Sequence, residues 1–275
     1  MAIKTEMFDL SGKVALVTGG TSGIGKAIAA ALVQHGARVL VGSRTMEKVE
    51  AAAVELDGLR DVSGDEAVAA GVALDVTSDA SVERAVRKAV DLFGGLHIVV
   101  NSAGVMLKKP TFDIESEEFT GIYNMHVTGS LRVAQSAGRI FREQHEGCII
   151  NLASISSFVD LVEVAAYASA KNAVLGLTRS LANEWAKYGI RTNAIAPGFV
   201  PTEINRKMIE GTDRGRRILE HTPMGRFGVA EEIAGGAVYL AAPAGRFVNG
   251  HTLVIDGGYL ASGIGDSVAP WEADK

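Results

Sequence analysis

Short apolar runs rich in valine, isoleucine and leucine alternate along the chain with longer alanine-rich segments that have the period of a helix. A helix of such length can return the chain to the start of a parallel neighbouring strand, so the alternation predicts an α/β fold. Most of the short runs are continuously apolar, which is typical of strands that are buried on both faces. We therefore expect a doubly wound sheet of seven parallel strands as the middle of three α/β/α layers.

The expected strands span residues 13–18, 37–42, 71–76, 96–101, 147–154, 190–196 and 251–256, and the expected helices span residues 23–35, 46–56, 79–93, 116–144, 165–187 and 230–242. Residues 201–228 interrupt the alternation, because this stretch is longer than a usual connection and rich in arginine, glutamate and glycine. Loops of that length are commonly lids, so we expect a short helical lid insert there. We expect a single domain over residues 1–275, with a tail at residues 264–275, since no repeat or low-complexity linker divides the chain.

The composition narrows the classes of partner. The 275 residues include 27 Lys and Arg against 32 Asp and Glu, a formal net charge of −5, which argues against a nucleic-acid partner held by a basic surface. No apolar run approaches the ~20 residues of a membrane helix, and no signal segment is evident, so we expect no membrane partner and no export.

Cys148 is the single cysteine, which excludes an intrachain disulfide and favours a reducing compartment. We expect a cytoplasmic protein, and no metal site, because the histidines lack a metal-ligand spacing.

A glycine-rich turn follows the first expected strand and opens the first expected helix. It reads Thr18-Gly19-Gly20-Thr21-Ser22-Gly23-Ile24-Gly25. Glycines allow the backbone to turn sharply and to approach a ligand closely, and the free N–H groups at a helix start attract a phosphate. The turn therefore predicts a cradle for the pyrophosphate of a dinucleotide. A tight strand-to-helix turn without a ligand is the alternative, because a glycine-rich turn alone is not specific.

The end of the second expected strand bears on the choice between NAD and NADP. An acidic residue there would bind the ribose 2′-hydroxyl of NAD. Ser43 and Arg44 stand there instead, so a 2′-phosphate would meet a hydroxyl and a guanidinium, and NADP is favoured while NAD stays possible. The alternative for Arg44 is a solvated residue at a helix entry. Asp75, beside Val76 at the end of the third expected strand, is placed to accept from the adenine amino group or to cap the helix that begins near Ser78.

A serine, a tyrosine and a lysine have a spacing that can bring them together. Tyr167 and Lys171 are four residues apart, on one face of the expected helix, and Ser154 lies at the carboxyl end of a strand, where α/β proteins bind ligands. Reduction of a carbonyl needs a proton donor, and a phenol with a pKa of ~10 serves near neutral pH when a cation such as Lys171 favours its ionised form. Ser154 would donate a hydrogen bond to the substrate oxygen as charge develops there. Each of the three residues has an alternative interpretation when it is considered alone: Ser154 as a turn residue, Tyr167 as a core residue and Lys171 as a solvated charge on a helix.

In combination, these motifs resemble the short-chain dehydrogenase/reductase family from about residue 10 to residue 258. Ser154, Tyr167 and Lys171 match the family's catalytic serine and its Tyr-x-x-x-Lys motif. Asn101-Ser102-Ala103-Gly104 is similar to the family's Asn-Asn-Ala-Gly motif, and residues 197–202 are similar to the segment that meets the nicotinamide carboxamide. The resemblance implies a Rossmann-type fold, Tyr167 as the acid/base, and a Lys171 that also holds the nicotinamide ribose.

The motifs and the resemblance together define the expected site. The expected catalytic residues are Ser154, Tyr167, Lys171 and, at the family's usual asparagine position, His126. The expected cofactor-binding residues are Gly19, Thr21, Ser22, Gly23, Ile24, Gly25, Ser43, Arg44, Asp75, Val76, Asn101, Ala103, Gly104, Tyr167, Lys171, Pro197, Gly198, Val200 and Thr202.

His126 is the departure from the family's pattern. The family usually has an asparagine three residues before a glycine on the helix after Asn-Ala-Gly, where it links the lysine to a water relay. In Asn124-Met125-His126-Val127-Thr128-Gly129 this position holds His126. Asn124 lies two residues earlier, a rotation of ~200° onto the opposite helix face, so it cannot simply replace the missing residue. We expect His126 to take that place, with its backbone carbonyl serving the relay; a rearranged relay or a side chain that only packs are the alternatives.

Substrate choice is expected to depend on residues 155–164, on Phe199 and on the lid. The lid holds six cationic residues and four acidic ones, a local charge of +2, which suits an anionic substrate, although a solvated helical face explains most of these residues as well. Residues 211–215, 222–228 and 256–263 look most like the family's sugar-acid and polyol dehydrogenases, such as gluconate 5-dehydrogenase-like enzymes. A 3-oxoacyl-[acyl-carrier-protein] reductase and a non-catalytic nucleotide-sensing protein are the alternatives. The resemblance also implies a homotetramer.

Overall fold

The computed structural model describes residues 5–59, 67–203 and 205–263, so the predicted tail lies outside the described residues. In these residues seven strands form one sheet in the order β3-β2-β1-β4-β5-β6-β7, and all neighbouring strands are parallel. The strands are β1 (Val14–Thr18), β2 (Arg38–Ser43), β3 (Ala69–Ala73), β4 (Ile98–Asn101), β5 (Gly147–Leu152), β6 (Ile190–Pro197) and β7 (Thr252–Ile255). The predicted Rossmann-type sheet is confirmed.

The third strand lies earlier in the chain than the sequence predicted. We expected residues 71–76, whereas β3 spans Ala69–Ala73. The backbone N–H groups of Val68 and Ala69 donate to Asp57 Oδ1, at 2.7 and 3.1 Å, and this anchors the start of the strand. The prediction missed this start because alanine has little preference for strands and Asp57 is distant in sequence.

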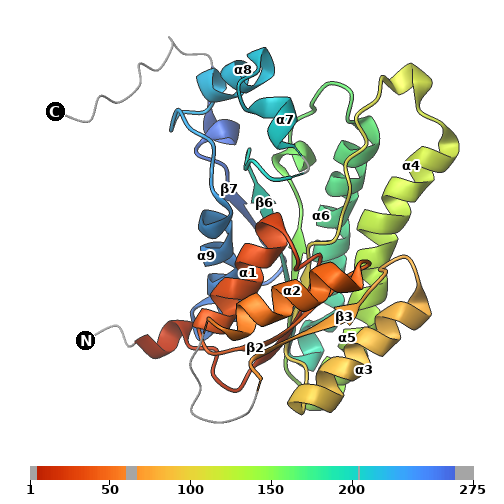
Figure 1. Cartoon of the computed structure of the whole chain (residues 1–275), viewed down its shortest axis with the longest axis vertical. Helices are drawn as coiled ribbons and strands as arrows, with labels where there is room; N and C mark the ends of the chain where they lie inside the picture. The colour runs from red at the N-terminus through yellow and green to blue at the C-terminus, as the bar shows by residue number, and fades with distance from the viewer. Residues whose placement is uncertain (1–4, 60–66, 204, 264–275) are drawn as a thin grey trace.

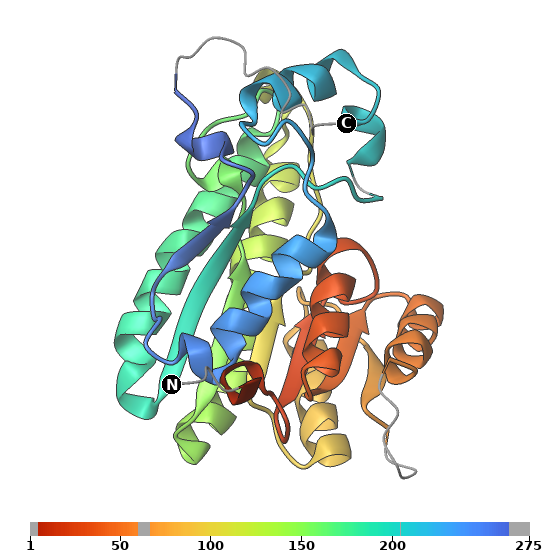
Figure 2. The ribbon, with the colours of Figure 1, turned by 90° about the vertical axis from the view of Figure 1, so that its left-hand side faces the viewer.

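Helices cover both faces of the sheet. One face carries α1 (Gly23–Gln34), α2 (Met46–Asp57) and α9 (Ala230–Ala241), and the other carries α3 (Asp79–Phe93), α5 (Gly129–Gln144) and α6 (Ala165–Trp185). Although α1 and α9 are far apart in the sequence, they lie side by side on their face (Figure 2). The layers are thus α, β and α, as the sequence predicted.

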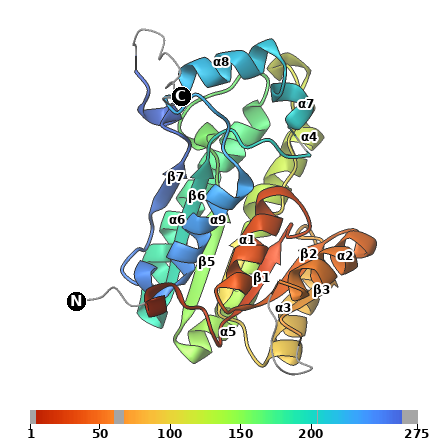
Figure 3. The same ribbon diagram turned by 60° about the vertical axis from the view of Figure 1, so that its left-hand side comes forward.

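The strand β1 shows why the apolar runs are continuous. Ala15 and Val17 belong to the apolar cluster that includes Ile28 of α1, whereas Leu16 belongs to the cluster on the opposite face with Val133 of α5. Successive side chains of a strand point to opposite faces, so every residue of a strand covered on both faces is buried. Figure 3 shows β1 and β2 between the helices of the two outer layers.

The segment expected as one helix over residues 116–144 contains an interruption. It consists of α4 (Ser116–Tyr123), a π-helical turn, η3 (Asn124–Thr128), and α5. Such a turn inserts one extra residue into a helix and is frequent at functional sites. The N–H of Gly129 donates to the carbonyl of Asn124 across this turn. The sequence carried no signal for it, because the residues of the turn keep the polarity pattern of the helix.

The expected lid is folded into two short helices. They are α7 (Arg206–Ile209) and α8 (Asp213–His221), and they lie at the top of the molecule, beyond the ends of β6 and α6 (Figure 1). Thr212 caps α8, since its hydroxyl accepts a hydrogen bond from the N–H of Gly215 at 3.0 Å. Among the helices of the described residues, none has the length and apolar character needed to cross a membrane.

Candidate active site

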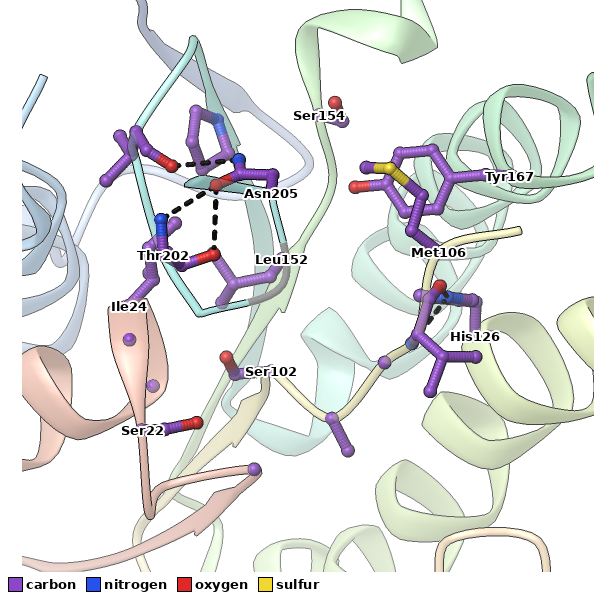
Figure 4. Close-up of a pocket in the computed structure, with 18 of the residues that line it drawn as sticks. Ser22, Ile24, Ser102, Met106, His126, Leu152, Ser154, Tyr167, Thr202 and Asn205 are labelled. Atoms are coloured by element: carbon purple, nitrogen blue, oxygen red, sulfur yellow. Dashed lines mark hydrogen bonds between the residues drawn. The ribbon is translucent and has the colours of Figure 1, made fainter. Parts of the chain in front are cut away.

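A cavity of about 400 Å³ opens at the carboxyl ends of the strands, under the lid. Its walls come from the glycine-rich turn, the ends of β2, β4, β5 and β6, the start of α6, and α7 and α8. Figure 4 shows Ser154, Tyr167 and His126 on one side of the cavity, with Ser22 and Ile24 of the glycine-rich turn across from them. Every residue that the sequence predicted for the site lines this cavity except Asn101.

The glycine-rich turn is shaped for close backbone contact. Gly19 has a φ of +67°, and a Cβ atom added to it would lie 2.9 Å from the backbone of Ala103. Thr18 Oγ1 accepts hydrogen bonds from the N–H groups of Ser102 and Ala103, both at 3.1 Å, which ties the turn to the loop after β4. Ser22 stands at the start of α1 without a side-chain cap, so the first N–H groups of that helix face the cavity for a ligand. These features fit a dinucleotide pyrophosphate.

Two cations gather where the second strand ends. Arg44 and Lys48 are exposed and line the cavity together with Ser43, and Lys48 lies in the first turn of α2. Asp75 Oδ1 accepts hydrogen bonds from Thr77 N–H and Oγ1, at 2.9 and 2.7 Å, and chiefly the backbone hydrogen bond lowers the pKa of its carboxyl. Ser78, and not Asp75, caps α3. Arg44 and Lys48 thus offer positive charge to a phosphate at this end of the cavity.

Ser154 and Tyr167 are in contact at the other end. Ser154 begins the turn η4 (Ile155–Ser157), where its Oγ accepts from the N–H of Ser156 at 3.1 Å. Burial raises the pKa of the Tyr167 phenol, and a hydrogen bond with Ser154 partly offsets this rise. Tyr167 therefore holds its proton at neutral pH in this structure.

Lys171 is buried one helical turn after Tyr167. Its Nζ donates to the carbonyl oxygen of Leu152 at 2.6 Å and lies 5.5 Å from the centre of the Tyr167 ring. Burial lowers the pKa of the Lys171 ammonium to about 7. We expected its charge to lower the pKa of Tyr167, but Lys171 is not among the groups that shift the pKa of this phenol: burial raises it, and the hydrogen bond with Ser154 lowers it.

His126 points into the site from the π-helical turn. The side chain is 3% exposed, and its Nε2 lies 2.7 Å from the carbonyl oxygen of Val105, to which it donates. Nδ1 is buried and has no hydrogen-bond partner among the described residues. Burial, and secondly the charge of Lys171, lower the pKa of the imidazole to about 3, so His126 is neutral. Its backbone carbonyl accepts from Ser130 Oγ at 2.7 Å.

Asn124 faces away from the cavity, as its spacing predicted. Its Oδ1 accepts from Arg132 Nη1 at 2.8 Å, and the Nε of that arginine lies 3.0 Å from an oxygen of Asp79 on α3. The residue that reaches the site from this turn is therefore His126, whose ring leaves no space for a Cβ at Gly104. Position 104 therefore needs a residue without a side chain, because the imidazole of His126 packs directly against its backbone.

Asn101 corrects the sequence prediction. It was expected to bind the cofactor, yet its side chain is buried behind the cavity wall, where Nδ2 donates to Asn151 Oδ1 at 2.9 Å and to the carbonyl of Ser130 at 3.3 Å. Asn151 in turn donates to Thr178 Oγ1 at 2.9 Å. Asn101 thus ties β4 to β5 and α5.

Sequence reasoning missed several residues of the cavity. Asn205 shapes the wall after β6: its Oδ1 accepts from the N–H of Thr202 at 2.7 Å and its Nδ2 donates to the carbonyl of Val200 at 3.0 Å (Figure 4). Lys48 had a usable signal, since it is a second cation four residues after Arg44. The other missed residues lie in loops and had none; they include Thr45, Val105 and Met106. Leu161, Val164, Met208, Ile209 and Arg214 belong to the two segments, residues 155–164 and the lid, that were expected to govern substrate choice.

The described residues contain no cluster of three or more histidine, cysteine, aspartate or glutamate side chains that could hold a metal ion. Cys148 is buried in β5, and burial raises the pKa of its thiol. Its Sγ lies 3.5 Å from the carbonyl oxygen of Leu240 on α9. A thiol that is buried and protonated is a packing residue rather than a nucleophile.

In a comparison with protein-family models, residues 19–260 match a model described as enoyl-(acyl carrier protein) reductase. This match covers most of the chain. The chain belongs to the short-chain dehydrogenase/reductase family. The resemblance that the sequence motifs indicated is therefore confirmed, and the chain is an NAD(P)-dependent dehydrogenase that acts on CH–OH groups.

Relatives within this family act on sugar acids and polyols. The chain is 36% identical over 260 residues to 2-dehydro-3-deoxy-D-gluconate 5-dehydrogenase of Dickeya dadantii, and the aligned residues cover 92% of this chain and 98% of that protein. It is 39% identical over 252 residues to D-threitol dehydrogenase of Mycolicibacterium smegmatis, covering 92% and 94%. The crystal structure of a gluconate 5-dehydrogenase from Burkholderia cenocepacia in complex with NADP and tartrate is similar, with a TM-score of 0.87 and 33% identity over 94% of this chain and 98% of that one.

Proposed function

We propose that the chain is an NADP(H)-dependent dehydrogenase that interconverts a secondary alcohol and a ketone on a sugar acid or polyol. The observation that carries this proposal is the contact of Ser154 with Tyr167 beside the buried Lys171, at the opposite end of the cavity from Arg44. One end offers a proton donor and the other a cation for a phosphate. The sugar acids and polyols in the names of the relatives support the substrate class.

In the proposed reaction each residue has a separate task. The bound nicotinamide cofactor supplies the hydride for reduction or accepts it in oxidation. Tyr167 gives its proton to the substrate oxygen during reduction, and the raised pKa of the phenol means that it is protonated at neutral pH before the reaction. Ser154 donates a hydrogen bond to the same oxygen as negative charge develops on it. Lys171 holds its Nζ 5.5 Å from the centre of the tyrosine ring and is proposed to hold the nicotinamide ribose.

The preference for NADP rests on the end of β2. Arg44 and Lys48 supply two positive charges there, and Ser43 stands where a carboxylate would repel a 2′-phosphate. Gly19 and the start of α1 are proposed to bind the pyrophosphate, and Asp75 the adenine. The structures of two relatives that contain NADP support this assignment.

A second candidate is a ketoreductase of the 3-oxoacyl-carrier-protein type. It is favoured by the walls around the lid, where Met106, Leu161 and Phe199 present apolar surface to the substrate end of the cavity. A non-catalytic nucleotide sensor has less support, because it would have no use for a serine, a tyrosine and a lysine brought together beside the nucleotide cradle.

The proposal is tested by assaying the purified protein with NADP and NADPH against sugar acids, polyols, their keto forms and 3-oxoacyl thioesters. Turnover of sugar acids or polyols supports the proposal, and turnover of thioesters alone supports the second candidate. Tight binding of NADPH, measured by its fluorescence, without turnover of any member of the panel would contradict both and favour the sensor.

We further propose a homotetramer built partly on α4, α5 and α6. This assembly rests on the resemblance to the family; in addition, the edge strand β7 is only partly covered within one chain, with Val254 37% exposed. Light scattering after gel filtration should give four times the chain mass of 28.8 kDa, and a single chain mass would contradict this assembly.

A further inference from the structure

The cations of the lid differ in whether a carboxylate neutralises them. Arg216 lies 3.2 Å from Asp213 and 3.4 Å from Glu220, both on its own helix α8. Arg226 pairs with Glu232 at 2.6 Å, and Arg206 lies 3.8 Å from Glu210. Carboxylates of the same chain therefore neutralise these three arginines. The positive charge that is left in the lid lies on fewer residues than the composition suggested.

Arg214 is the cation of α8 that lines the cavity. It is half-buried, and it makes no hydrogen bond or ion pair with a carboxylate in the described residues. Its charge lowers the pKa of Glu163 and partly offsets the raised pKa of Tyr259, so its field reaches both of these side chains. Glu163, however, is already bound to Lys108, with Nζ and Oε2 2.6 Å apart.

The surroundings of Arg214 favour an outside partner. Met208 and Ile209 of α7 line the same end of the cavity, together with Phe199 and Leu161. A guanidinium beside apolar walls is poorly solvated, which strengthens its attraction for an anion that reaches it. Glu203 also lines the cavity, but it is exposed and forms no ion pair with Arg214.

We infer that Arg214 binds a carboxylate of the substrate, so that this enzyme acts on acids rather than on neutral polyols. This inference rests on the proposed function and narrows its substrate class. A planar guanidinium binds a carboxylate through two parallel hydrogen bonds, which orients the substrate as well as attracting it. With a net charge of −5 the protein as a whole does not attract anions, so the attraction of an acid to this end of the cavity has to come from a local cation.

The first experiment compares Arg214→Gln with Arg217→Gln in steady-state assays. Arg217 is the matched control, since it lies on α8, is exposed and does not line the cavity. The substrates are D-gluconate and 2-dehydro-3-deoxy-D-gluconate against the neutral D-threitol. We expect the wild type to prefer the acids and Arg214→Gln to raise their KM about ten- to one-hundred-fold, with kcat little changed and Arg217→Gln without effect. A wild type that prefers D-threitol, or an unchanged KM in Arg214→Gln, overturns the inference and leaves the proposed dehydrogenase intact.

The second experiment needs no turnover. Binding of tartrate to the NADP-loaded protein is measured by calorimetry in the wild type and both variants. Binding that weakens about tenfold or more in Arg214→Gln alone supports the inference, even if no substrate of the panel is turned over and the proposed function fails. Equal binding in all three proteins, or none in the wild type, overturns it. The Kd of NADPH serves as the folding control and should be the same in all three.

Discussion

The imidazole of His126 stands edge-on against the phenol ring of Tyr167, with ring centroids 5.4 Å apart and planes at 87°. The family's usual residue at this position is an asparagine, which has no ring to place there. Since the imidazole is neutral and donates from Nε2 to Val105, it contributes shape and one hydrogen bond rather than charge. Its buried Nδ1 has no hydrogen-bond partner among the described residues.

His126→Asn should therefore retain substantial activity, with kcat/KM reduced by less than about tenfold, well short of the loss of a general acid. An asparagine amide can also donate to the carbonyl of Val105, and the backbone carbonyl of residue 126 is unchanged. His126→Phe keeps a ring against Tyr167 but leaves Val105 without its donor, so it should be the less active variant. A loss in His126→Asn as large as that of Tyr167→Phe would show that the imidazole itself is required.

Tyr167→Phe should abolish turnover, with a fall of about 10²–10⁴-fold in kcat, because it removes the proton that reduction consumes. The ring contact with His126 and the position of Lys171 are kept, so the binding of NADPH should be nearly unchanged. Stopped-flow and fluorescence titration measure the two quantities on one preparation. Activity that survives in Tyr167→Phe would assign the proton transfer to another group, and the role given to Tyr167 would be wrong.

The residues that could be predicted from the sequence share one property: their position follows from local structure. Four residues on a helix put Tyr167 and Lys171 on one face, and strand ends in a parallel sheet meet at one edge, which brings Ser154 and the glycine-rich turn to the same cavity. The same rule placed Asn101 at that edge, but it does not decide whether a side chain at a strand end turns toward the cavity or, as here, into the neighbouring layer.

What could not be predicted depends on contacts between distant segments. The sequence predicted that the cationic lid suits an anionic substrate, but not which of its cations lines the cavity: Arg214 does so because of how α8 is placed, and no spacing in the sequence relates it to Tyr167. The direction of the Lys171 ammonium is likewise set by the carbonyl of Leu152, 19 residues earlier. The π-helical turn contains one extra residue, which changes which side chains face the site but leaves the polarity pattern of the helix unchanged. The periodicity of the sequence therefore could not place His126 in the site, and only the resemblance to the family did so.

Arg44→Gln and Lys48→Gln should each lower kcat/KM for NADPH by about ten- to one-hundred-fold and leave that for NADH nearly unchanged, because only NADPH carries the 2′-phosphate. Lys26→Gln is the matched control, since Lys26 lies on α1 outside the cavity and pairs with Glu55 at 2.5 Å. Steady-state kinetics with both cofactors check this. A wild type that prefers NADH would overturn the roles given to Ser43 and Arg44.

The burial of His126 predicts a pH dependence of stability. Its pKa is lowered from 6.5 to about 3 in the folded protein, so below pH 6.5 the unfolded chain takes up a proton that the folded protein does not. The free energy of unfolding must then fall as the pH falls from 6.5 toward 3, by about 1.4 kcal/mol per pH unit at most. Lys171, with its pKa lowered from 10.5 to about 7, changes stability above pH 7 instead, where stability rises with pH.

The window between pH 6.5 and pH 5 therefore isolates the histidine, because Lys171 titrates above it and the carboxyls with lowered pKa, such as Glu232, titrate below it. Urea unfolding of the wild type should lose roughly 1.5 kcal/mol more across this window than that of His126→Asn, which has no group to protonate at this position. The remaining histidines are common to both proteins, so their contributions cancel in the difference. Parallel curves for the two proteins would mean that the imidazole is protonated in the folded state, and His126 would then be a cation beside Tyr167 and Lys171 rather than the neutral ring described above.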